Sequence, residues 1–486
     1  MKRIYIIQAI PYVNANPHVG HALESVQADA LARFYRALGY DVYFSWGSDE
    51  NSLKNVQAAE AEGIKTEDLV EKYADRFLDL KDALGLTFDV FNRTASKEHF
   101  AGAQKFWSLC KSEDIYKKKY RGLYCIGCEA FYTPDEIVEG KCPDGHSNIE
   151  EIEEENYFFR LSSYTDFLKK LISTDKLRIV PESRKHEVLS FIGQGLKDFS
   201  ISRSVERAHG WGVPVPGDNS QIMYVWFDAL VTYLTALGFG SAKQDLYEKY
   251  WVGSALRQAQ GKRAPEVRRL HVIGKGIIRF HAVYWPAMLA SAGLPLPSDE
   301  FVHGYITVEG QKISKSLGNV VDPFELVEKF GREAVRFYLL REIPAWGDGD
   351  FSIDRFHDLY NGELANGLGN LVARVARLAS DTNLALPQKK NFTFKKVVLE
   401  NLKNFRFDQA LIGLWEEISK LDKKINEEKP WELEGPSLKK VITPIAQEIR
   451  EIAFNLGPFL PETSEKILAQ FTGKILSEKP LFPRLH

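Results

Sequence analysis

The chain contains little cysteine and no long apolar run, and each absence excludes a class of protein. Four cysteines among 486 residues are too few for the disulfide framework of a secreted domain, so we expect a reducing, cytoplasmic location. No stretch reaches the roughly 18 apolar residues that a membrane-spanning helix requires, which excludes a membrane protein of that kind. Neither sign of charge is in excess, because 63 Lys and Arg face 66 Asp and Glu. This balance excludes nucleic-acid binding driven by bulk charge but leaves room for a local basic groove.

The length and composition are ordinary for a soluble multidomain enzyme. At roughly 150 residues per domain, the 486 residues predict about three domains, with enough chain to bury a core without disulfides or metal. The first ten residues resemble a signal peptide, with Lys2 and Arg3 before an apolar run. That run is too short for a signal peptide, and a Pro- and Asn-rich segment follows it directly at 11–17, so we interpret it as a strand.

The N-terminal region has the pattern of a parallel α/β sheet. Residues 4–10 predict a short buried strand, and helical periodicity over 21–38 predicts a helix that Gly39 ends. Residues 41–46 predict a second strand, which a polar loop at 47–51 follows. Strand, loop, helix, strand is the opening of a parallel sheet, in which ligands bind beyond the carboxyl ends of the strands. Both polar loops lie at those ends.

The middle of the chain interrupts this pattern. Between about 115 and 210 a Cys-, Gly- and Pro-rich stretch is followed by an acidic run, which we interpret as the solvated face of an inserted module. The acidic residues are Glu150, Glu151, Glu153, Glu154 and Glu155. The α/β pattern returns with short apolar runs at 223–228 and 270–274, each leading into a helix-like segment.

From about residue 355 onward strand patterns vanish. Amphipathic helices predicted over 359–378 and 399–424 indicate a helical bundle.

Two histidines and a glycine follow the first predicted strand. His18 and His21 are three residues apart, so at the start of a helix both imidazoles share one face. Unsatisfied N–H groups and the helix dipole make that point an anion site, and Gly20 allows a flat base or a phosphate to approach closely. Taken alone, two such histidines can equally be structural or surface groups.

A second motif, Gly-Gln-Lys-Ile-Ser-Lys-Ser-Leu-Gly-Asn, occupies residues 310–319. Lys312 and Lys315 lie in a Ser- and Gly-rich loop that could close over a polyphosphate and neutralise charge in a transition state. The alternative for such a short motif is a solvated basic loop.

Together the two motifs are specific. A His-x-Gly-His motif after the first strand, combined with Lys-Ile-Ser-Lys-Ser near residue 312 and a split α/β domain between them, resembles the class I aminoacyl-tRNA synthetases, and among them the methionine-specific members. The resemblance runs along nearly the whole chain. Its further segments are residues 9–12, 47–50, 224–229, 273–275, 280–281, 285–288, 369–374 and 429–431.

The resemblance implies an activity and a set of site residues. The activity is methionine–tRNA ligation: ATP activates methionine to methionyl-adenylate, which then esterifies the 3′ end of tRNA(Met), with Mg2+ accompanying ATP. The implied methionine pocket consists of Ala9, Ile10, Tyr12, Asp49, Trp226, Ala229, Tyr233, Ile277 and His281. Of these, the aromatic rings suit the thioether and Asp49 suits the ammonium group of the substrate.

The remaining implied residues bind the nucleotide and the anticodon. ATP contacts fall on His18, Gly20, His21 and Lys315, and the catalytic residues are His18, His21, Lys312 and Lys315. Asn370, Arg374 and Trp431 are implied to read the anticodon. Taken alone, Asn370 could be an interior polar cap, Arg374 a surface charge and Trp431 a buried core residue.

Three of the four cysteines predict a structural zinc site. Cys125 and Cys128 have Cys-x2-Cys spacing, which is typical of tetrahedral zinc, and Cys142 with His146 could complete the set. In relatives that carry zinc the last two ligands are usually separated by two residues rather than three, so the fourth ligand stays open. The alternative is a metal-free relic of such a site.

Some positions depart from the family pattern. Asn51 and Ser52 stand where His-Gly is usual, Leu230 replaces a proline and Gly276 stands where aspartate is common. These changes affect the expected nucleotide contacts more than the amino-acid pocket.

The fold we expect is a Rossmann-type parallel-sheet catalytic domain, split by an inserted zinc-knuckle module and followed by an all-α anticodon-binding bundle. The expected boundaries are 1–115 and 211–303 for the catalytic halves, 116–210 for the insert, 304–354 for a stem-contact region with the Lys-Ile-Ser-Lys-Ser loop, and 355–486 for the bundle. The expected partners are tRNA(Met), ATP and L-methionine, with no membrane, and we expect a monomer.

Two other functions fit parts of the sequence. Class I synthetases for leucine, isoleucine or valine carry an editing insertion of well over 150 residues, which the space between 115 and 210 cannot hold. Cysteine enzymes place a metal in the amino-acid pocket, whereas these cysteines lie in the insert. A non-enzymatic RNA-binding protein with a zinc ribbon would not need both intact motifs.

Overall fold

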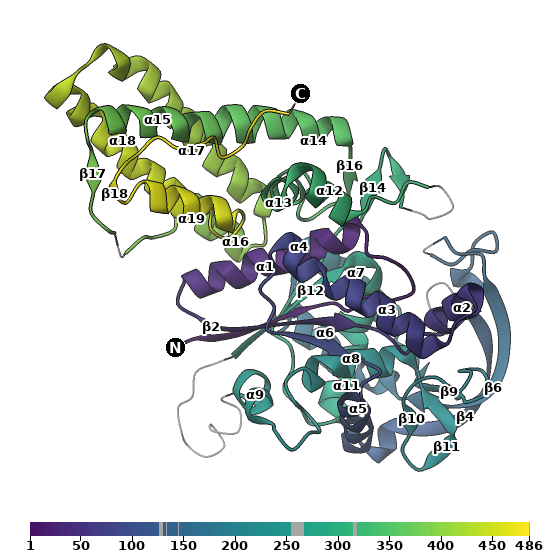
Figure 1. The fold of residues 1–486 in the computed structure, drawn as a ribbon. Helices are drawn as coiled ribbons and strands as arrows, with labels where there is room; N and C mark the ends of the chain where they lie inside the picture. The colour runs from purple at the N-terminus through teal and green to yellow at the C-terminus, as the bar shows by residue number, and fades with distance from the viewer. Residues whose placement is uncertain are drawn as a thin grey trace, which may run out of the picture. The chain divides into compact units, whose positions relative to one another are not determined.

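One parallel sheet organises the N-terminal half of the chain (Figure 1). The computed structural model describes residues 1–125, 130–132, 134–143, 145–253, 267–313, 318–389 and 391–485. Within them the chain divides into two compact units. We call the first, Met1–Pro17, Leu38–Lys81 and Thr87–His303, the sheet unit, and the second, His18–Ala37, Asp82–Leu86 and Gly304–His486, the helical unit.

The sheet has six parallel strands among the described residues, in the order β3-β2-β1-β12-β13-β7. Their bounds are β1 (Arg3–Gln8), β2 (Asp41–Ser48), β3 (Val90–Arg93), β7 (Arg178–Val180), β12 (Val267–Gly274) and β13 (Asp299–His303). Ile4, Ile6 and Ile7 are all fully buried, so β1 is covered on both faces, and its apolar residues 4–7 are continuous rather than alternating. The first five strands follow the doubly wound order, which reverses between β1 and β12. That reversal marks the expected ligand crevice.

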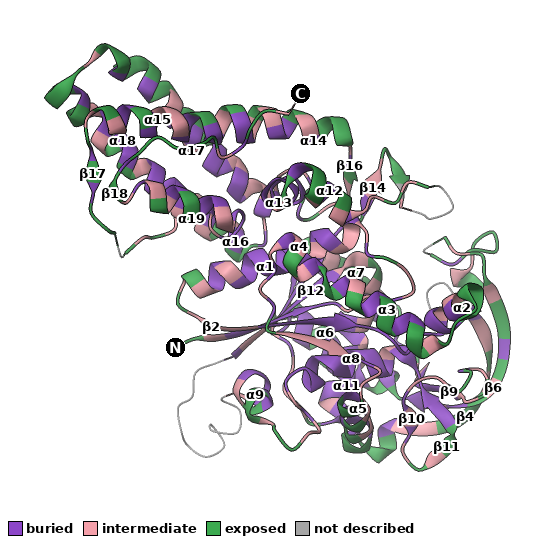
Figure 2. Cartoon of the chain, in the orientation of Figure 1, coloured by how far each residue is buried: buried purple, intermediate pink, exposed green. Residues whose placement is uncertain are grey.

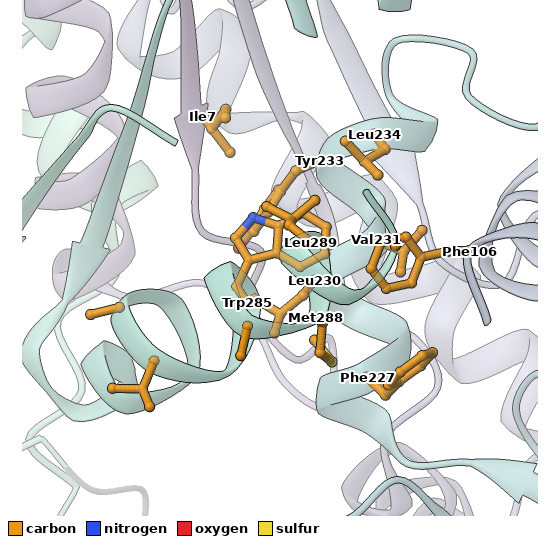
Figure 3. Close-up of a cluster of buried hydrophobic side chains, with 14 of the residues drawn as sticks. Ile7, Phe106, Phe227, Leu230, Val231, Tyr233, Leu234, Trp285, Met288 and Leu289 are labelled. Atoms are coloured by element: carbon orange, nitrogen blue, oxygen red, sulfur yellow. The ribbon is translucent and has the colours of Figure 1, made fainter. Parts of the chain in front are cut away.

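The sheet unit packs its core against helices α8 and α11. Figure 3 shows Tyr233 and Leu230 of α8 beside Trp285, Met288 and Leu289 of α11, all buried. The helices of this unit are α2 (Leu53–Glu62), α3 (Thr66–Leu78), α4 (Leu80–Leu84, shared with the helical unit), α5 (Lys97–Leu109), α6 (Thr165–Ser173), α7 (Glu182–Gly193), α8 (Val225–Thr235), α9 (Asp245–Tyr247) and α11 (Trp285–Ser291). Short 3-10 or π segments are η1 (Ser112–Asp114), η2 (Pro134–Glu136), η3 (Leu161–Tyr164), η4 (Glu248–Val252), η5 (Lys275–Ile277) and η6 (Phe280–Tyr284).

Antiparallel strands occupy much of the segment expected to be inserted and continue just beyond it. They are β4 (Ile115–Cys125), β5 (Ala130–Tyr132), β6 (Ile149–Phe159) and β8 (Phe199–Ser200) in one sheet, and β9 (Ser202–Ser204), β10 (Pro214–Val215) and β11 (Asp218–Met223) in another. The acidic run lies on β6, where Glu153 and Glu155 pair in register with Arg121 and Lys119 of β4. Figure 2 shows this pair of strands largely exposed or intermediate, as expected for a solvated face. Of the five acidic residues of the run, Glu154 is half-buried and the other four are exposed.

The structure adds two details to the expectations for this unit. The apolar run at 223–228 is a strand only at its first residue, because β11 ends at Met223 and α8 begins at Val225. β11 also belongs to an antiparallel sheet rather than to the parallel one. Residues 178–180, within the expected insert, form β7 and add a strand to the edge of the parallel sheet.

The helical unit contains the bundle and the helix that follows β1. Its helices are α1 (Val19–Ala37), α12 (Pro323–Phe330), α13 (Arg332–Arg341), α14 (Ile353–Leu359), η8 (Tyr360–Gly369), α15 (Asn370–Asp381), α16 (Lys396–Lys403), α17 (Phe407–Glu428), η9 (Pro430–Glu432), α18 (Gly435–Leu456) and α19 (Pro461–Gln470). Its strands are β14 (Ile306–Val308), β15 (Gln311–Lys312), β16 (Gly349–Phe351), β17 (Ala385–Leu386) and β18 (Gly473–Lys474). The last two pair with each other, so strands do not vanish entirely after residue 355.

The helix expected over 399–424 is two helices. α16 ends at Lys403 and α17 begins at Phe407, because Phe405 adopts a positive φ of 58° that no right-handed helix contains. Along α17 most buried side chains recur three or four residues apart, and the helix packs against α13, α16 and α18.

A fully buried arginine ties distant parts of this unit together. Arg336 of α13 forms an ion pair with Asp29 of α1, with 2.8 Å between Nη1 and Oδ2. Its guanidinium also donates to the carbonyls of Leu84, Pro458 and Phe459, at 3.2, 3.2 and 2.9 Å.

None of the helices in the described part of the chain combines the length and the apolarity needed to cross a membrane.

Candidate active site

The first group of expected pocket residues follows the carboxyl ends of β1 and β2. The Ala9 N–H donates to the Val272 carbonyl at 3.0 Å, which continues β1 alongside β12. The Asp49 N–H donates to the Pro11 carbonyl at 2.8 Å, and Asp49 forms a parallel bridge with Tyr12. Ala9, Tyr12 and Asp49 are thus positioned by backbone hydrogen bonds at the point where the strand order reverses, the usual ligand position of such sheets.

The second group lies on α8 and on the segment after β12. Trp226, Ala229 and Tyr233 are spaced three and four residues apart, so they share one face of α8. The Tyr233 hydroxyl lies 2.7 Å from Nε2 of His281, and Nδ1 of His281 lies 3.0 Å from the Ile277 carbonyl. Since that carbonyl can only accept, Nδ1 carries the proton and Nε2 accepts from the tyrosine. Burial lowers the pKa of His281 to about 4, so the ring is neutral at pH 7.

An aromatic wall adjoins this pair. Trp226 stacks on Phe280 with ring centroids 3.8 Å apart and planes 3° apart, and it meets His281 edge-on at 6.3 Å. Polarizable rings of this kind favour a thioether sulfur, by about 0.3–1.5 kcal/mol per contact. The wall therefore offers a surface that suits a thioether.

The two histidines of the His-x-Gly-His motif lie in the helical unit, at the start of α1. Their rings stack with centroids 3.8 Å apart. Nδ1 of His21 accepts the His18 N–H, and Nδ1 of His18 accepts the Gly20 N–H, each at 3.1 Å. Burial lowers the pKa of His18 to about 4 and the pKa of His21 well below its ordinary value. At pH 7 both rings are therefore neutral, with the proton on Nε2 as a donor.

Gly20 is required by this arrangement. A Cβ at position 20 would lie 2.9 Å from Cε1 and 3.0 Å from Nδ1 of His18. Any side chain there would push the His18 ring out of the stack, so glycine is needed for the histidine geometry as well as for ligand approach.

The lysine motif is described only in part. Lys312 lies on β15, whose backbone pairs with Thr307 of β14, and Lys315 lies outside the described residues. The chain resumes at Gly318, and the Val321 carbonyl accepts the Val19 N–H at 3.0 Å. The segment that leaves the lysine loop is thus bonded to the first turn of α1, beside the histidine pair.

Three of the four expected metal ligands come together. The ligand atoms of Cys125, Cys142 and His146 all lie within 4.8 Å of one another, and Cys128 lies outside the described residues. The Cys142 Sγ and His146 Nδ1 atoms are 3.6 Å apart. Bond lengths of about 2.3 Å for Zn–S and 2.0–2.1 Å for Zn–N at tetrahedral angles would separate these atoms by about the same distance. The residues present therefore fit a zinc ion.

The expected anticodon residues lie at two places in the helical unit. Asn370 begins α15 and is exposed, and Arg374 one turn later bonds to Asp422 and Asn426 of α17. Trp431 lies in η9 with 51% of its surface exposed, so it is not the buried tryptophan of the alternative interpretation. Within the described residues, no hydrogen bond or ring contact joins Trp431 to Asn370 or Arg374.

One contact of the pocket was missed by sequence reasoning. Asn51 bonds to Asp228 of α8, 177 residues away. A single polar contact at such a separation leaves no periodicity and no motif spacing. The signals in the sequence are its place two residues after Asp49 and its departure from the family pattern.

The comparison with known proteins defines the class first. The family described as tRNA synthetases class I (M) matches residues 4–152 and 145–376, and the chain belongs to this family.

Individual relatives narrow the comparison. The methionine–tRNA ligase of Clostridium acetobutylicum is 40% identical over 96% of this chain and 73% of its own length. That of Thermotoga maritima is 38% identical over 98% of this chain and 76% of its own length. The crystal structure of Mycobacterium tuberculosis methionyl-tRNA synthetase bound by methionyl-adenylate matches with a TM-score of 0.89 and 35% identity, covering 99% of this chain and 100% of that one.

Proposed function

We infer that the chain is a methionine–tRNA ligase, which activates methionine with ATP and transfers it to the 3′ end of tRNA(Met). The observation that carries this inference is the agreement along nearly the whole chain with a structure that holds methionyl-adenylate. The two groups of pocket residues described above supply the amino-acid side of such a site.

In the first step the methionine carboxylate attacks the α-phosphorus of ATP in line, and pyrophosphate leaves. A carboxylate is already an adequate nucleophile, so the protein supplies positioning and charge stabilisation rather than a general base. We assign the two neutral Nε2–H groups of His18 and His21 to the phosphates, at the positive end of α1. Lys312 and Lys315 would neutralise the departing pyrophosphate, and Mg2+ bound with ATP would offset the charge of its phosphates.

The methionine would be held at both ends. Asp49 would accept the ammonium group, and the neutral Tyr233–His281 pair with the Trp226 wall would receive the thioether. Ala9, Ile10, Tyr12, Ala229 and Ile277 would complete the pocket, small residues leaving space and apolar ones excluding water.

The second step transfers the methionyl group from the adenylate to the terminal ribose of tRNA. We propose that Asn370, Arg374 and Trp431 read the anticodon, because they offer an amide, a planar fork and an exposed stacking surface. The domain boundaries expected from the sequence, a monomeric state and a cytoplasmic location belong to the same proposal.

Pyrophosphate exchange tests the activity. We expect ATP–pyrophosphate exchange that depends on methionine and not on leucine, isoleucine, valine or cysteine, followed by charging of tRNA(Met). Exchange supported by another amino acid, or no exchange with any, would contradict the assignment.

Zinc is tested separately. We propose one zinc ion per chain, held by Cys125, Cys128, Cys142 and His146 with a structural role. Elemental analysis should give about one zinc per chain, falling well below that in Cys142→Ser. If protein prepared without chelators contains no zinc, the proposal fails, whereas full occupancy in His146→Ala would reassign only the fourth ligand.

A further inference from the structure

We propose that Asn51 is a positioning residue for the amino-acid substrate, because it links the loop that carries Asp49 to the pocket helix α8. The proposal rests on the role proposed above for Asp49 as the partner of the substrate ammonium group. Asn51 itself would touch no substrate. It would act through two buried side chains, Asp228 and His99.

The loop after β2 is held at successive residues. Ser48 Oγ donates to Glu50 Oε1 at 2.6 Å, and the Glu50 N–H donates to Thr94 Oγ1 at 2.8 Å. The Glu50 carbonyl accepts the indole N–H of Trp211 at 2.7 Å. The Asp49 carbonyl accepts from Nδ2 of Asn55 at 3.0 Å. With the Asp49 N–H already bonded to Pro11, the backbone of Asp49 is held on both sides.

These bonds fix the loop to its own neighbourhood, and Asn51 fixes it to α8. Nδ2 of Asn51 donates to the Thr94 carbonyl at 3.0 Å and to Oδ2 of Asp228 at 2.6 Å. Both amide hydrogens are thereby used, and both side chains are buried, Asn51 at 6% and Asp228 at 1% exposure. In such a low-dielectric place a charge-assisted hydrogen bond is short and directional.

The other oxygen of Asp228 is equally constrained. Oδ1 lies 2.6 Å from Nε2 of His99, and Nδ1 of His99 lies 2.8 Å from Oγ1 of Thr235. Asp228 lies between Trp226 and Ala229 on α8, and Thr235 ends the same helix. The network therefore fastens the Asp49 loop to the helix that carries the aromatic wall.

This connection sets the distance between the two ends of the pocket. An amino acid held at its ammonium group and at its side chain needs both partners within about 0.5 Å of the productive geometry. Loss of Asn51 leaves the Asp228 carboxylate buried with one hydrogen bond fewer and lets the Asp49 loop shift relative to α8. A displacement of about 1 Å at such a site can cost roughly 100-fold.

Ligand analogues distinguish positioning from general destabilisation. Methioninol keeps the ammonium group and the thioether, whereas 4-(methylthio)butanoate keeps the carboxylate and the thioether but has no ammonium group. For Asn51→Ala we expect calorimetry to show methioninol binding weakened about 10- to 100-fold and 4-(methylthio)butanoate binding changed by less than about threefold. In pyrophosphate exchange, KM for methionine should rise by a similar factor while kcat changes by less than about fivefold.

A control variant and a pair of Asp228 variants complete the test. Asn455→Ala removes a buried amide of the bundle that also bonds to backbone groups, and it should leave both analogues unaffected. Asp228→Asn keeps an acceptor for Asn51 and replaces the acceptor for His99 by an N–H donor, which Nε2 of His99 can accept once its proton moves to Nδ1, facing Thr235 Oγ1. It should therefore rescue most of the methioninol affinity that Asp228→Leu loses. This second pair serves equally if Asn51→Ala does not fold.

The outcomes separate the two proposals. If Asp49→Asn does not weaken methioninol binding, the role of Asp49 is wrong. If Asp49→Asn weakens it but Asn51→Ala leaves it unchanged, or weakens both analogues equally, the positioning role of Asn51 is wrong.

Discussion

His18 and His21 share one arrangement: Nδ1 accepts a backbone N–H, and the ring keeps its proton on Nε2. Substitutions can separate these two functions of His21. The amide of glutamine reaches the position of Nε2, whereas the amide of asparagine reaches that of Nδ1. We therefore expect kcat for pyrophosphate exchange to fall about 100-fold or more in His21→Asn, which loses the donor to phosphate. It should fall only about 10-fold in His21→Gln, which keeps that donor.

Equal rates for the two variants would contradict the assigned donor. The low pKa values of both rings add a check, since neither should titrate in the working range. The pH profile of kcat between about 5.5 and 8 should therefore show no step that disappears in His21→Gln.

At the scale of elements, β12 and β13 carry two buried ionisable groups opposite each other. His271 pairs in register with Glu300, and both are fully buried. Within the described residues, neither ring nitrogen of His271 and neither carboxylate oxygen of Glu300 has a hydrogen-bond partner. Burial raises the pKa of Glu300 well above its ordinary value and lowers the pKa of His271 well below its own. Both side chains are therefore favoured in their neutral forms.

The raised pKa of Glu300 predicts that this residue lowers the free energy of unfolding more at high pH than at low pH. Well below about pH 4.3 the Glu300 carboxyl is protonated in both the folded and the unfolded chain. As the pH rises, this carboxyl ionises first in the unfolded chain. The free energy of unfolding therefore falls until the pH passes the pKa of Glu300 in the folded chain. We expect Glu300→Leu to raise the free energy of unfolding by about 1–3 kcal/mol at pH 8 and by less at pH 5. Denaturant titrations at both pH values measure this. Glu300→Gln is the matched control, and a gain that does not grow with pH in either variant would contradict the prediction.

Replacing the buried Arg336 of α13 should lower the free energy of unfolding, whereas replacing Glu300 should raise it. Its guanidinium is fully buried against Asp29 and three carbonyls, so Arg336→Met leaves uncompensated polar groups. We expect a loss of about 3–5 kcal/mol in the free energy of unfolding, measured by denaturant titration. The control is Arg355→Met, which breaks an ion pair with Glu342 whose arginine is 48% exposed, and should cost at most about 1 kcal/mol. Equal losses would show that the Arg336 contacts contribute little.

Local patterns predicted the opening of the parallel sheet and one of its later strands. The strands at 4–10, 41–46 and 270–274 and the helix at 21–38 correspond to β1, β2, β12 and α1, because continuous apolar runs and helical periodicity are properties of neighbouring residues. The break in the bundle at Phe405 was not predicted, since a positive φ at a residue other than glycine has no compositional signal.

At the scale of the whole molecule, some features of the candidate site could be predicted from the sequence and others could not. The polar loops at 11–17 and 47–51 could be placed at one edge of the sheet, because each follows a parallel strand and the carboxyl ends of such strands meet there. The individual pocket residues came from the resemblance. The tautomers of His18, His21 and His281 could not be predicted, because they depend on which backbone groups face each ring nitrogen. The Asn51–Asp228–His99 network joins three distant segments and depends on tertiary packing alone.

The anticodon proposal concerns the whole molecule, because it separates the two steps of the reaction. Trp431 is 51% exposed, so Trp431→Ala should change the melting temperature little. Stacking of a base on an aromatic ring is worth about 1–3 kcal/mol, so charging of tRNA(Met) should fall about 10- to 100-fold. Pyrophosphate exchange without tRNA should stay within about twofold of the unchanged protein. If both steps fall equally, Trp431 is a packing residue and the assignment fails.

The contacts of Arg336 also bear on how the chain matures on the ribosome. Asp29 emerges early in synthesis, whereas the Pro458 and Phe459 carbonyls emerge about 430 residues later. At about 5–20 residues per second, the helix that bears His18 and His21 waits on the order of 20 to 90 s for these partners. Until then the guanidinium that pairs with Asp29 lacks two of its three carbonyl acceptors, so nascent chains stalled before residue 458 should carry a protease-sensitive α1, and the histidine pair should become ordered only once residue 459 has emerged.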